Sequence, residues 1–468
     1  MIHCHSLDSD TICALATAPG GALGIIRVSG PQALSMVSKI CRRDISDFPA
    51  NSVRYTHIVS TPLQPVAEPQ QQIEIVDEAL ITVFHAPRSY TGEDAVEISC
   101  HGSAYILNKV LDMLVKNGCR IARPGEFTQR AYLNGKLDLS QAEAVADLIA
   151  ATNKATHDIA MSQLRGHFSS DLKTLRGQLL ELTSLLELEL DFSDHEDLEF
   201  ANRTELLELA QKIESHIASL AQTFETGQAL KQGIPVAIIG KTNVGKSTLL
   251  NQLVNDNRAI VSDIHGTTRD TIEETMDING VQFRFIDTAG LRETTDEVEK
   301  IGIERTMQAI NQARIVIWLL DQQPSCDELE EMHNLLKGKI HLCVHNKIDI
   351  IDSKTFTPYI TPLFTISAKT GEGIPNLKQQ IFKEAQKSGL TANANGIIIT
   401  NARHYEALTH AHANIQRVIY GLHQQQSGDL LAEDLRLVLS DLTEITGEGQ
   451  ITPQETLNHI FSSFCVGK

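Results

Sequence analysis

A glycine-bracketed turn in the middle of the chain constrains its fold more than any other stretch. The apolar run at residues 236–239 leads into Gly240, and the spacing Gly-x-x-x-x-Gly-Lys-Ser continues to Ser247. Glycines at these two points let the backbone fold tightly, so that consecutive N–H groups and a helix N-terminus face an anion. Lys246 would reach the β- and γ-phosphates of a nucleotide, and the Ser247 hydroxyl would bind Mg²⁺. The loop residues expected to bind nucleotide are Gly240, Asn243, Val244, Gly245, Lys246, Ser247 and Thr248.

Three further motifs follow apolar runs later in the chain and complete a nucleotide site. An Asp-x-x-Gly motif suits an acid that orders the Mg²⁺ shell and a glycine that moves with the γ-phosphate. An Asn-Lys-x-Asp motif resembles the guanine-reading motif of GTPases, because a carboxylate accepts paired N–H donors from guanine but would meet an acceptor on adenine. A Ser-Ala-Lys motif looks like the loop that closes over the base, so the four motifs together predict GTP. The last three supply Asp287, Thr288, Ala289 and Gly290, then Asn346, Lys347 and Asp349, then Ser367, Ala368 and Lys369.

Length and charge limit the class of protein. A chain of 468 residues, 42% of them hydrophobic, can bury more than one core, because single cores seldom grow past about 250–300 residues. We therefore expect three domains. The formal net charge of −19 argues against a general nucleic-acid coat, so any RNA contact must be local or shared with a partner.

Cysteine usage and hydropathy predict the compartment. The eight cysteines include no Cys-x-x-Cys pair and no zinc spacing, so they are expected to be reduced thiols. The N-terminus lacks a basic region followed by an apolar core, and no run approaches about 18 apolar residues. These features predict a cytoplasmic protein without a membrane segment.

The N-terminal part, residues 1–135, has the pattern of an α+β domain. Short β-rich runs occur at residues 23–28, 79–84 and 95–100, and one helical stretch lies around residues 104–114. The fold class expected for the whole chain is therefore multidomain, with this α+β domain preceding a Ras-like α/β nucleotide domain at residues 233–388.

Helical periodicity flanks the nucleotide domain on both sides. It covers residues 136–232 and returns between residues 389 and 468, which predicts long amphipathic helices. We expect the two helical segments to pack as one discontinuous bundle into which the nucleotide domain is inserted, since the ends of inserted domains usually lie close together. The residues 140–143 have the spacing of a capping box. The apolar stripes are Leu172, Leu175, Leu179, Leu182 and Leu186, then Leu206, Ala210, Ile213, Ile217, Leu220 and Phe224, and finally Leu431, Leu435, Val438, Leu442 and Ile445.

An acidic stretch at residues 191–197 separates two of these helices. It contains four carboxylates and one histidine, which could be mistaken for a metal cluster. Because no repeat spacing fixes a ligand geometry, we interpret it as a solvated interhelical loop.

Six stretches spread over nearly the whole chain carry a family resemblance. They are Leu23-Gly24-Ile25-Ile26-Arg27-Val28-Ser29-Gly30, Tyr90-Thr91-Gly92-Glu93-Asp94, Arg123-Pro124-Gly125-Glu126-Phe127, Asn134-Gly135-Lys136-Leu137-Asp138-Leu139, Gly266-Thr267-Thr268-Arg269-Asp270 and Phe464-Cys465-Val466-Gly467-Lys468. Together they resemble the MnmE (TrmE) family of tRNA-modifying GTPases. The nucleotide motifs are shared with many families, so the N-terminal motifs and the ending Phe-Cys-Val-Gly-Lys are the specific part.

This resemblance implies a domain plan and a reaction. It implies a folate-binding and dimerising N-terminal domain, a discontinuous helical domain and an inserted G domain. It also implies a homodimer that works with MnmG, an FAD-containing partner, in a heterotetramer or larger complex. Together they would build a carboxymethylaminomethyl group on the wobble uridine of certain tRNAs, with a one-carbon tetrahydrofolate (5-formyl or 5,10-methylene) as a cofactor.

The catalytic group for hydrolysis is not the usual one. Leu291 stands where Ras-like GTPases place a glutamine that orients water, and a leucine side chain neither accepts nor donates a hydrogen bond. The resemblance points instead to Glu299, acting through water on the nucleophile. From the residues alone, a solvated acidic turn at 295–300 is the alternative.

The resemblance also implies that K⁺ takes the place of an arginine finger. It puts the Asn243 side chain on K⁺ together with backbone oxygens of the loop that follows, while Thr268 completes the Mg²⁺ shell begun by Ser247. Amide and carbonyl oxygens are suitable hard ligands for such cations. The K⁺ ligands implied are Asn243, Ser262, Ile264 and Thr267, and the nucleotide-binding loop as a whole is Ser262, Asp263, Ile264, His265, Gly266, Thr267 and Thr268.

For the folate, the resemblance implies Arg27, Glu97, Lys136 and Lys468. A pterin ring offers paired N–H donors to a carboxylate, and basic groups suit the glutamate tail. Cys465 has two readings, a buried small hydrophobic residue or a reactive thiol beside the folate. A different class of function also stays open: a ribosome-assembly or signalling GTPase switch of the Era/EngA type, whose flanking domains would be interaction surfaces.

Overall fold

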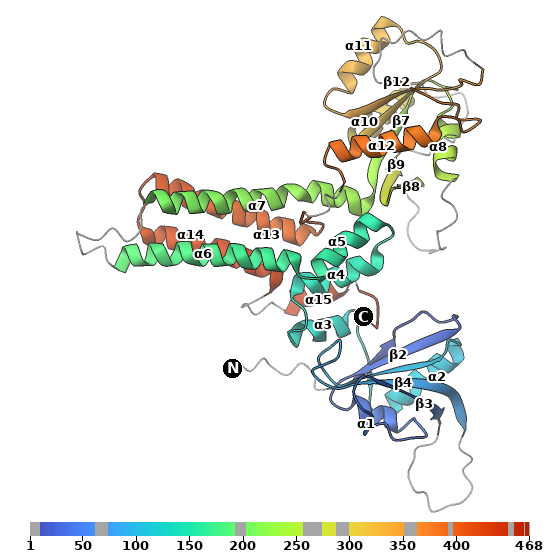
Figure 1. The fold of residues 1–468 in the computed structure, drawn as a ribbon, viewed down its shortest axis with the longest axis vertical. Coiled ribbons are helices and arrows are strands. Elements are labelled where there is room, and N and C mark those ends of the chain that lie inside the picture. Colours follow the sequence, from blue (N-terminus) through green and yellow to red (C-terminus); the bar gives the residue numbers. More distant parts are fainter. Residues whose placement is uncertain are drawn as a thin grey trace, which may run out of the picture. The chain divides into compact units, whose positions relative to one another are not determined.

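The computed structural model describes residues 10–60, 74–191, 203–255, 274–286, 299–350, 363–391, 396–447, 454–462 and 464–467 (Figure 1). Within these ranges it leaves out the side chains of residues 187–191, 255, 299–305, 454, 455 and 459. The chain divides into two compact units, which are described separately below. Unit 1 comprises Met1–Ile149, Gln163–Leu172 and Thr443–Lys468, and unit 2 comprises Ala150–Ser162 and Lys173–Leu442.

A six-stranded sheet with the order β3-β4-β5-β2-β1-β6 forms the centre of unit 1. All its pairings are antiparallel except that of β1 with β6. The β-rich runs and the helix predicted in this region are confirmed, but two further helices, α1 and α3, were not predicted. The elements are β1 Ile12–Leu15, β2 Leu23–Ser29, α1 Ala33–Ser38, β3 Ser52–Val59, β4 Ile75–Phe84, β5 Ala95–His101, α2 Ala104–Lys116, β6 Arg120–Ile121 and α3 Glu126–Leu133.

The two faces of this sheet differ in character. Alternate residues such as Ile26, Ile81 and Ile98 are fully buried in a core with α1 and α2. The residues between them point to the opposite face, where Arg27 and Glu97 face each other across β2 and β5. This second face also carries exposed apolar side chains, namely Leu23, Val53, Tyr55 and Leu80. Side-chain alternation with a period of two therefore places the candidate folate residues on the face that α1 and α2 do not cover.

A small helical core completes unit 1. It joins α4 (Leu139–Ala150) to α15 (Gln454–Ser462), and its members are Leu139, Ala142, Leu457, Ile460, Phe461 and Phe464. The predicted capping box at residues 140–143 is wrong by two positions. Asp138 accepts from the backbone N–H of Gln141 at 2.9 Å, and the Gln141 side chain accepts from the N–H of Asp138 at 3.0 Å. The carboxylate of Asp138 already caps this helix, whereas Ser140 lies inside it and donates to Asp138.

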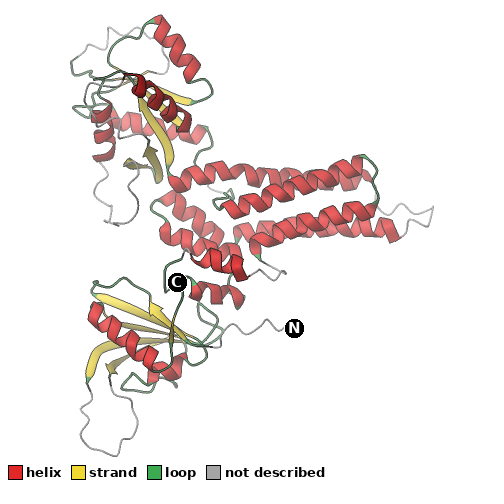
Figure 2. Cartoon of the chain, turned by 180° about the vertical axis from the view of Figure 1, so that it is seen from behind, coloured by secondary structure: helices red, strands yellow, loops and turns green. Residues whose placement is uncertain are grey.

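Long helices make up one part of unit 2. These are α5 Lys154–Leu164, α6 His167–Asp191, α7 Arg203–Gln232, α13 Ala402–His423 and α14 Gly428–Thr446, of which α5, α6 and α14 extend across the division between the units. Figures 1 and 2 show α6, α7, α13 and α14 running alongside one another. The predicted packing of the two helical segments is confirmed, since Phe224 of α7 stacks on Tyr405 of α13 with ring centroids 4.3 Å apart. His412 of α13 is also 2.7 Å from Glu214 of α7.

The other part of unit 2 is a six-stranded α/β sheet with the order β12-β11-β10-β7-β9-β8. Its pairings are parallel except that of β8 with β9. Alternate residues of β7 face two cores, because Val236 packs with α8 and α12 while Ala237 packs with α10. The elements are β7 Ile234–Ile239, α8 Lys246–Asn255, β8 Glu274–Ile278, β9 Val281–Phe285, α10 Glu299–Gln312, β10 Ile315–Leu320, α11 Cys326–Leu335, β11 Ile340–His345, β12 Leu363–Thr365 and α12 Ile374–Lys387. In the part of the chain described here, no helix combines the length and apolar character needed to cross a membrane.

Candidate functional site

The phosphate loop runs from the end of β7 to the start of α8, as predicted. Its backbone is left-handed at Gly240 (φ +149°), Asn243 (φ +62°) and Gly245 (φ +100°). A Cβ on Gly240 would lie 2.4 Å from the Leu319 carbonyl oxygen, and one on Gly245 would lie 2.4 Å from the side-chain nitrogen of Asn346. Both glycines are therefore required by conformation and by close approach.

Lys246 lies at the first position of α8 and bends back over this loop. Its Nζ donates to the carbonyls of Gly240 and Lys241, both at 2.8 Å. Desolvation by burial lowers the pKa of this amine from its usual value. The two carbonyl oxygens hold the Lys246 ammonium beside the N-terminus of α8. A nucleotide phosphate bound there would replace them as acceptors.

Asn346 ties the phosphate loop to the base loop. Its side-chain nitrogen donates to the Val244 carbonyl at 2.8 Å, and its side-chain oxygen accepts from the Ala368 N–H at 2.8 Å. The Asp349 carboxylate accepts from the Ser367 hydroxyl at 2.8 Å. The first, third and fourth sequence motifs are thus brought together at the carboxyl ends of β7, β11 and β12, the edge of a parallel sheet where ligands usually bind.

Asp321 belongs to this cluster but was not predicted. It follows β10 directly and lies 2.7 Å from Lys347 Nζ. Lys347 itself has a left-handed backbone (φ +67°), a conformation that costs a non-glycine residue free energy. A polar residue straight after a buried apolar strand was the available signal, because it places Asp321 at the same sheet edge as Asp349.

Several predicted residues lie outside the described part of the chain. Glu299 is the first residue of α10, but only its backbone is described. The catalytic and cation assignments therefore remain predictions. Leu291 and residues 192–197 of the acidic stretch also lie outside the described residues. The undescribed site residues are Ser262, Asp263, Ile264, His265, Gly266, Thr267, Thr268, Asp287, Thr288, Ala289, Gly290 and Lys468.

A second cluster in unit 1 surrounds Arg27. Its Nε and Nη2 both donate to Glu97 Oε1, at 3.0 and 2.8 Å. The guanidinium carbon lies 5.6 Å from the ring centre of Tyr90 and 5.7 Å from that of Phe127, so the cation contacts two aromatic rings. Beside it is a small cavity of about 70 Å³, well below the volume of sites that enclose a whole drug-sized ligand. The cavity is lined by Arg27, Ser29, Phe84, Tyr90, Thr91, Ala95 and Glu97.

The C-terminal segment reaches the same cluster. Val466 forms a β-bridge with Pro124, and the Cys465 carbonyl accepts from the Gly125 N–H at 3.4 Å. The Gly467 carbonyl then accepts from Arg27 Nη1 at 3.4 Å. Cys465 itself is exposed, so the prediction of a buried small hydrophobic residue is wrong. Phe461 and Phe464, in contrast, are buried in the small helical core.

Lys136 lies near this cluster without lining the cavity. Its Nζ donates to the Pro87 carbonyl at 3.0 Å, and a Cβ on Gly92 would be 3.3 Å from its stem. Lys136 therefore packs against the loop that carries Tyr90. Tyr90 and Phe127 were missed as site residues because only the tertiary fold brings their rings to Arg27.

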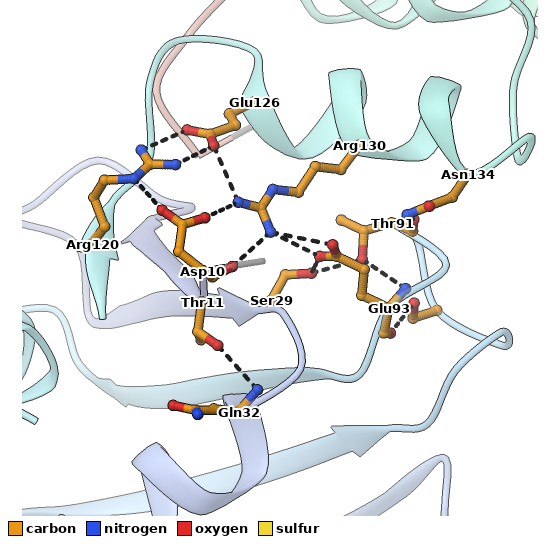
Figure 3. Close-up of polar contacts among 11 residues, drawn as sticks. Asp10, Thr11, Ser29, Gln32, Thr91, Glu93, Arg120, Glu126, Arg130 and Asn134 are labelled. Carbon is orange, nitrogen blue, oxygen red and sulfur yellow. Dashed lines mark hydrogen bonds and ion pairs between the residues drawn. The ribbon is translucent and has the colours of Figure 1, made fainter. Parts of the chain in front are cut away.

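A network of charges holds the Tyr90 loop in place (Figure 3). Arg130 of α3 contacts Asp10 at 2.7 Å, Glu93 at 3.2 Å and Glu126 at 3.2 Å. Arg120 joins Asp10 and Glu126 from the other side, and Glu93 accepts from the Ser29 hydroxyl at 2.7 Å. Burial raises the pKa of Glu126, but hydrogen bonds from the Arg120 side chain and the Arg123 N–H, together with the charges of Arg120 and Arg130, outweigh it, so the net pKa is lowered.

Comparison with known proteins gives a consistent result over the whole chain. Residues 11–136 match the family model described as the GTP-binding protein TrmE N-terminus, and residues 139–465 match that of the MnmE helical domain. A protein of Phocaeicola vulgatus named tRNA modification GTPase MnmE is 51% identical, with 99% of each chain covered. One of the same name from Bacteroides thetaiotaomicron is 48% identical over 99% of this chain and 100% of that protein. Among solved structures, the G domain of the T. maritima FeoB iron transporter is 26% identical, covers 33% of this chain and 99% of that one, and has a TM-score of 0.25.

Proposed function

The chain belongs to the MnmE (TrmE) family of tRNA modification GTPases, and on that basis we propose that it modifies the wobble uridine, position 34, of certain tRNAs. It is a GTP hydrolase that acts in tRNA modification. The proposed reaction adds a carboxymethylaminomethyl group at C5 of the uridine in the cytoplasm. The protein would act with an FAD-containing partner of the MnmG type, in a heterotetramer or larger complex.

The arrangement of the base loop carries the nucleotide part of this proposal. Asp349 is held by the Ser367 hydroxyl, and Asn346 fixes both the phosphate loop and the base loop. A carboxylate held at the end of β11 suits the paired N–H donors of guanine. Mg²⁺ would be held by Ser247 and Thr268, and it would neutralise charge on the phosphates.

Hydrolysis is proposed to depend on K⁺ and on a glutamate. Asn243 has an exposed side chain on the phosphate loop, which fits a ligand for a cation beside the phosphates. Glu299 would act on the attacking water, because Leu291 cannot. In matched KCl and NaCl, wild-type protein should hydrolyse GTP faster in K⁺, and Asn243→Ala should abolish that difference. Glu299→Ala should lower kcat about 10²-fold or more; equal wild-type rates in the two salts would refute the cation role.

The Arg27 cluster is the proposed folate site. Glu97 would accept N–H donors of the pterin ring, while Arg27, Lys136 and Lys468 would bind its polar oxygens and glutamate tail. The small cavity beside Arg27 has an apolar wall at Phe84 and Tyr90, against which a flat ring would pack. Cys465 lies in the segment that docks beside this site, and a role for its thiol in the one-carbon chemistry stays a proposal.

A homodimer formed through unit 1 is part of the same proposal. The sheet face that α1 and α2 do not cover carries four exposed apolar side chains, and such a face is better buried against a second copy. Tyr55→Glu together with Leu80→Glu should convert dimer to monomer in sedimentation. An unchanged dimer would exclude this face.

Nucleoside analysis of tRNA tests the whole proposal. Cells lacking the protein should lose the carboxymethylaminomethyl group on position 34, and the wild-type gene should restore it. Unchanged wobble uridines would contradict the proposal and favour the alternative, a GTPase switch of the Era/EngA type. That alternative predicts a defect in ribosome profiles instead.

A further inference from the structure

The Asn-Lys-x-Asp motif sends its three polar side chains in different directions. Asn346 contacts the phosphate loop and the base loop, and Asp349 contacts Ser367. Lys347 instead crosses to the neighbouring strand, where its Nζ lies 2.7 Å from the Asp321 carboxylate. Asp321 follows β10 directly, whereas Lys347 comes two residues after β11. The lysine stem therefore spans the ends of two adjacent parallel strands, β11 and β10.

The strand order places this ion pair on the path of a bound nucleotide. The phosphate loop follows β7, and the residues proposed to face the base follow β11 and β12. In the sheet, β10 lies between β7 and β11. Neighbouring strands are about 4.8 Å apart, so a nucleotide that contacts both loops must extend across the end of β10. The Lys347 stem and the Asp321 carboxylate lie at that end.

Backbone hydrogen bonds hold the turn at Lys347 without the Asp321 side chain. The N–H of Asn346 donates to the Leu320 carbonyl at 2.7 Å, and the N–H of Ile350 donates to the Lys347 carbonyl at 3.0 Å. These bonds keep Lys347 in its left-handed conformation (φ +67°). The turn should therefore survive the loss of the Asp321 carboxylate. That carboxylate controls the direction of the lysine side chain, which is flexible by itself.

The charge of Asp321 is balanced by Lys347. Their side chains are 19% and 32% exposed, so the pair is partly shielded from water. His345 pairs with Leu320 in the register of β11 and β10, and burial lowers its pKa although Asp321 opposes the shift. Its imidazole is therefore mostly neutral near pH 7 and leaves the carboxylate to the lysine. Because ion pairs of this exposure add little to stability, the consequence of this one lies in where it holds the lysine stem.

We infer that Asp321 is a positioning residue for nucleotide binding, which holds the Lys347 stem across the end of β10 as a surface on which base and ribose pack. The methylene groups of the stem offer an apolar contact that does not distinguish one purine from another. The pair therefore supports affinity, whereas Asp349 selects guanine. The inference rests on the nucleotide site proposed above and adds to it a residue from another strand.

Nucleotide titration of the full chain separates affinity from selectivity. Asp321→Asn keeps the size of the side chain but removes its charge, so GDP and inosine diphosphate should both bind about tenfold more weakly. Inosine lacks the exocyclic amino donor of guanine, so the ratio of the two affinities reports base selection. Asp321→Asn should leave that ratio at the wild-type value, whereas Asp349→Asn should change it. In GTP hydrolysis, KM should rise while kcat stays within about twofold.

Glu384→Gln is the matched control. Glu384 lies 2.7 Å from Lys387 Nζ near the end of α12, and its side chain is 22% exposed. The control thus breaks an ion pair of the same length in the same domain, with a carboxylate of similar exposure. It should bind both nucleotides as wild type does. The melting temperatures of Asp321→Asn and the control should agree within about 3 °C, which excludes a folding defect as the cause of weaker binding.

A double-mutant cycle with Lys347→Met tests the pairing itself. Methionine keeps most of the apolar stem but leaves the Asp321 carboxylate unpaired beside an anionic ligand. Lys347→Met should therefore bind GDP more weakly than Asp321→Asn does, and adding Asp321→Asn to it should restore part of the affinity. Losses that simply add would show that the two residues act independently and would overturn the inference. So would wild-type affinity in Asp321→Asn, or a changed ratio of GDP to inosine diphosphate affinity.

These measurements need neither tRNA nor folate, so the two proposals fail separately. A wild-type chain that binds GDP and inosine diphosphate equally would count against the proposed role of Asp349 and leave the Asp321 result standing.

Discussion

The nucleotide loops of unit 2 follow neighbouring strands of a single sheet, whereas the Arg27 cluster of unit 1 draws on β2, β5, α3 and the segment at residues 464–467. In the first region each motif is a short run of consecutive residues, and glycine backbone geometry does much of the positioning. In the second, Arg27 meets Glu97 through strand register, and the Gly467 carbonyl arrives from the other end of the sequence. The nucleotide loops should therefore tolerate substitutions elsewhere in the chain. The geometry of the Arg27 cluster depends on the packing of all of unit 1.

The largest effect is expected at Gly245. Gly245→Ala would push a Cβ within 2.4 Å of the Asn346 side chain and would also strain a left-handed backbone. Displacing the Asn346 side chain would break its hydrogen bond to the Val244 carbonyl. This loss and the backbone strain should together weaken GTP and GDP binding about 100-fold or more. Fluorescent-nucleotide titration measures this, with Gly338→Ala as the control for strain without a close contact. Unchanged affinity would mean that the loop is not positioned by its backbone.

The next effect concerns base recognition by Asp349. Asp349→Asn replaces one acceptor by a donor, so GTP affinity should fall roughly 10- to 100-fold. Xanthosine triphosphate, which presents an acceptor at that position, should bind the variant better than it binds wild type. Competition titrations with both nucleotides check the switch. A variant with wild-type preference for GTP would remove Asp349 from the base site.

A smaller effect is expected in the Arg27 cluster. Arg27→Lys keeps the charge but loses the two hydrogen bonds to Glu97 and the flat group between two rings, so 5-formyltetrahydrofolate should bind about tenfold more weakly. GTP affinity should not change. Deleting Lys468 should act in the same direction. Calorimetry with both ligands measures the two affinities. A parallel loss of GTP binding would show that the Arg27 cluster and the nucleotide loops are not independent.

The smallest effect is the response of unit 1 to acid. The pKa values of Asp10 and Glu126 are lowered, since hydrogen bonds and charges of Arg120 and Arg130, and for Glu126 also the Arg123 N–H, outweigh the opposing effect of burial. The unfolded chain therefore binds more protons near and below the ordinary glutamate value of 4.5. The stabilisation is complete above that pH and is lost as the pH falls through the folded-state values.

Thermal unfolding of the full chain between pH 3 and 6 tests this dependence. The melting temperature should be flat above about pH 5 and should fall by several degrees below pH 4. Glu126→Gln should reduce that slope, because the amide no longer titrates. A slope equal to that of wild type would assign the acid sensitivity to other carboxylates.

The nucleotide domain and the Arg27 cluster also differ in how much of their structure the sequence predicts. Four strands of the nucleotide domain, β7, β9, β11 and β12, could be predicted because a recognisable motif follows each of them, whereas β8 and β10 were not predicted. Asp321 was missed although it has the same placement, because no motif contains it. The helix cap at Asp138 was placed two residues too late, since Ser140 and Asp138 both have the right spacing to a downstream acid or amide.

Arg27 and Glu97 could be predicted as folate-binding residues only through the family resemblance. Nothing local to Arg27 or Glu97 predicts that they face each other, because strand register is set by the sheet as a whole. The rings of Tyr90 and Phe127 and the charges of Asp10 and Arg130 come from separate elements. Hydrophobic patterning predicts which side of a strand is buried, but not which polar side chains meet on the other side.

The strand-like docking of residues 464–467 has a consequence for biosynthesis. Unit 1 contains Gln163–Leu172 and then nothing until Thr443, so the ribosome makes most of unit 2 before the last part of unit 1. At about 5–20 residues per second, this interval lasts roughly 15 to 55 s. During that time the Arg27 guanidinium lacks the Gly467 carbonyl, and Pro124 lacks its bridge to Val466. A nascent chain can therefore complete its nucleotide site while the Arg27 cluster, the proposed folate site, is still unfinished.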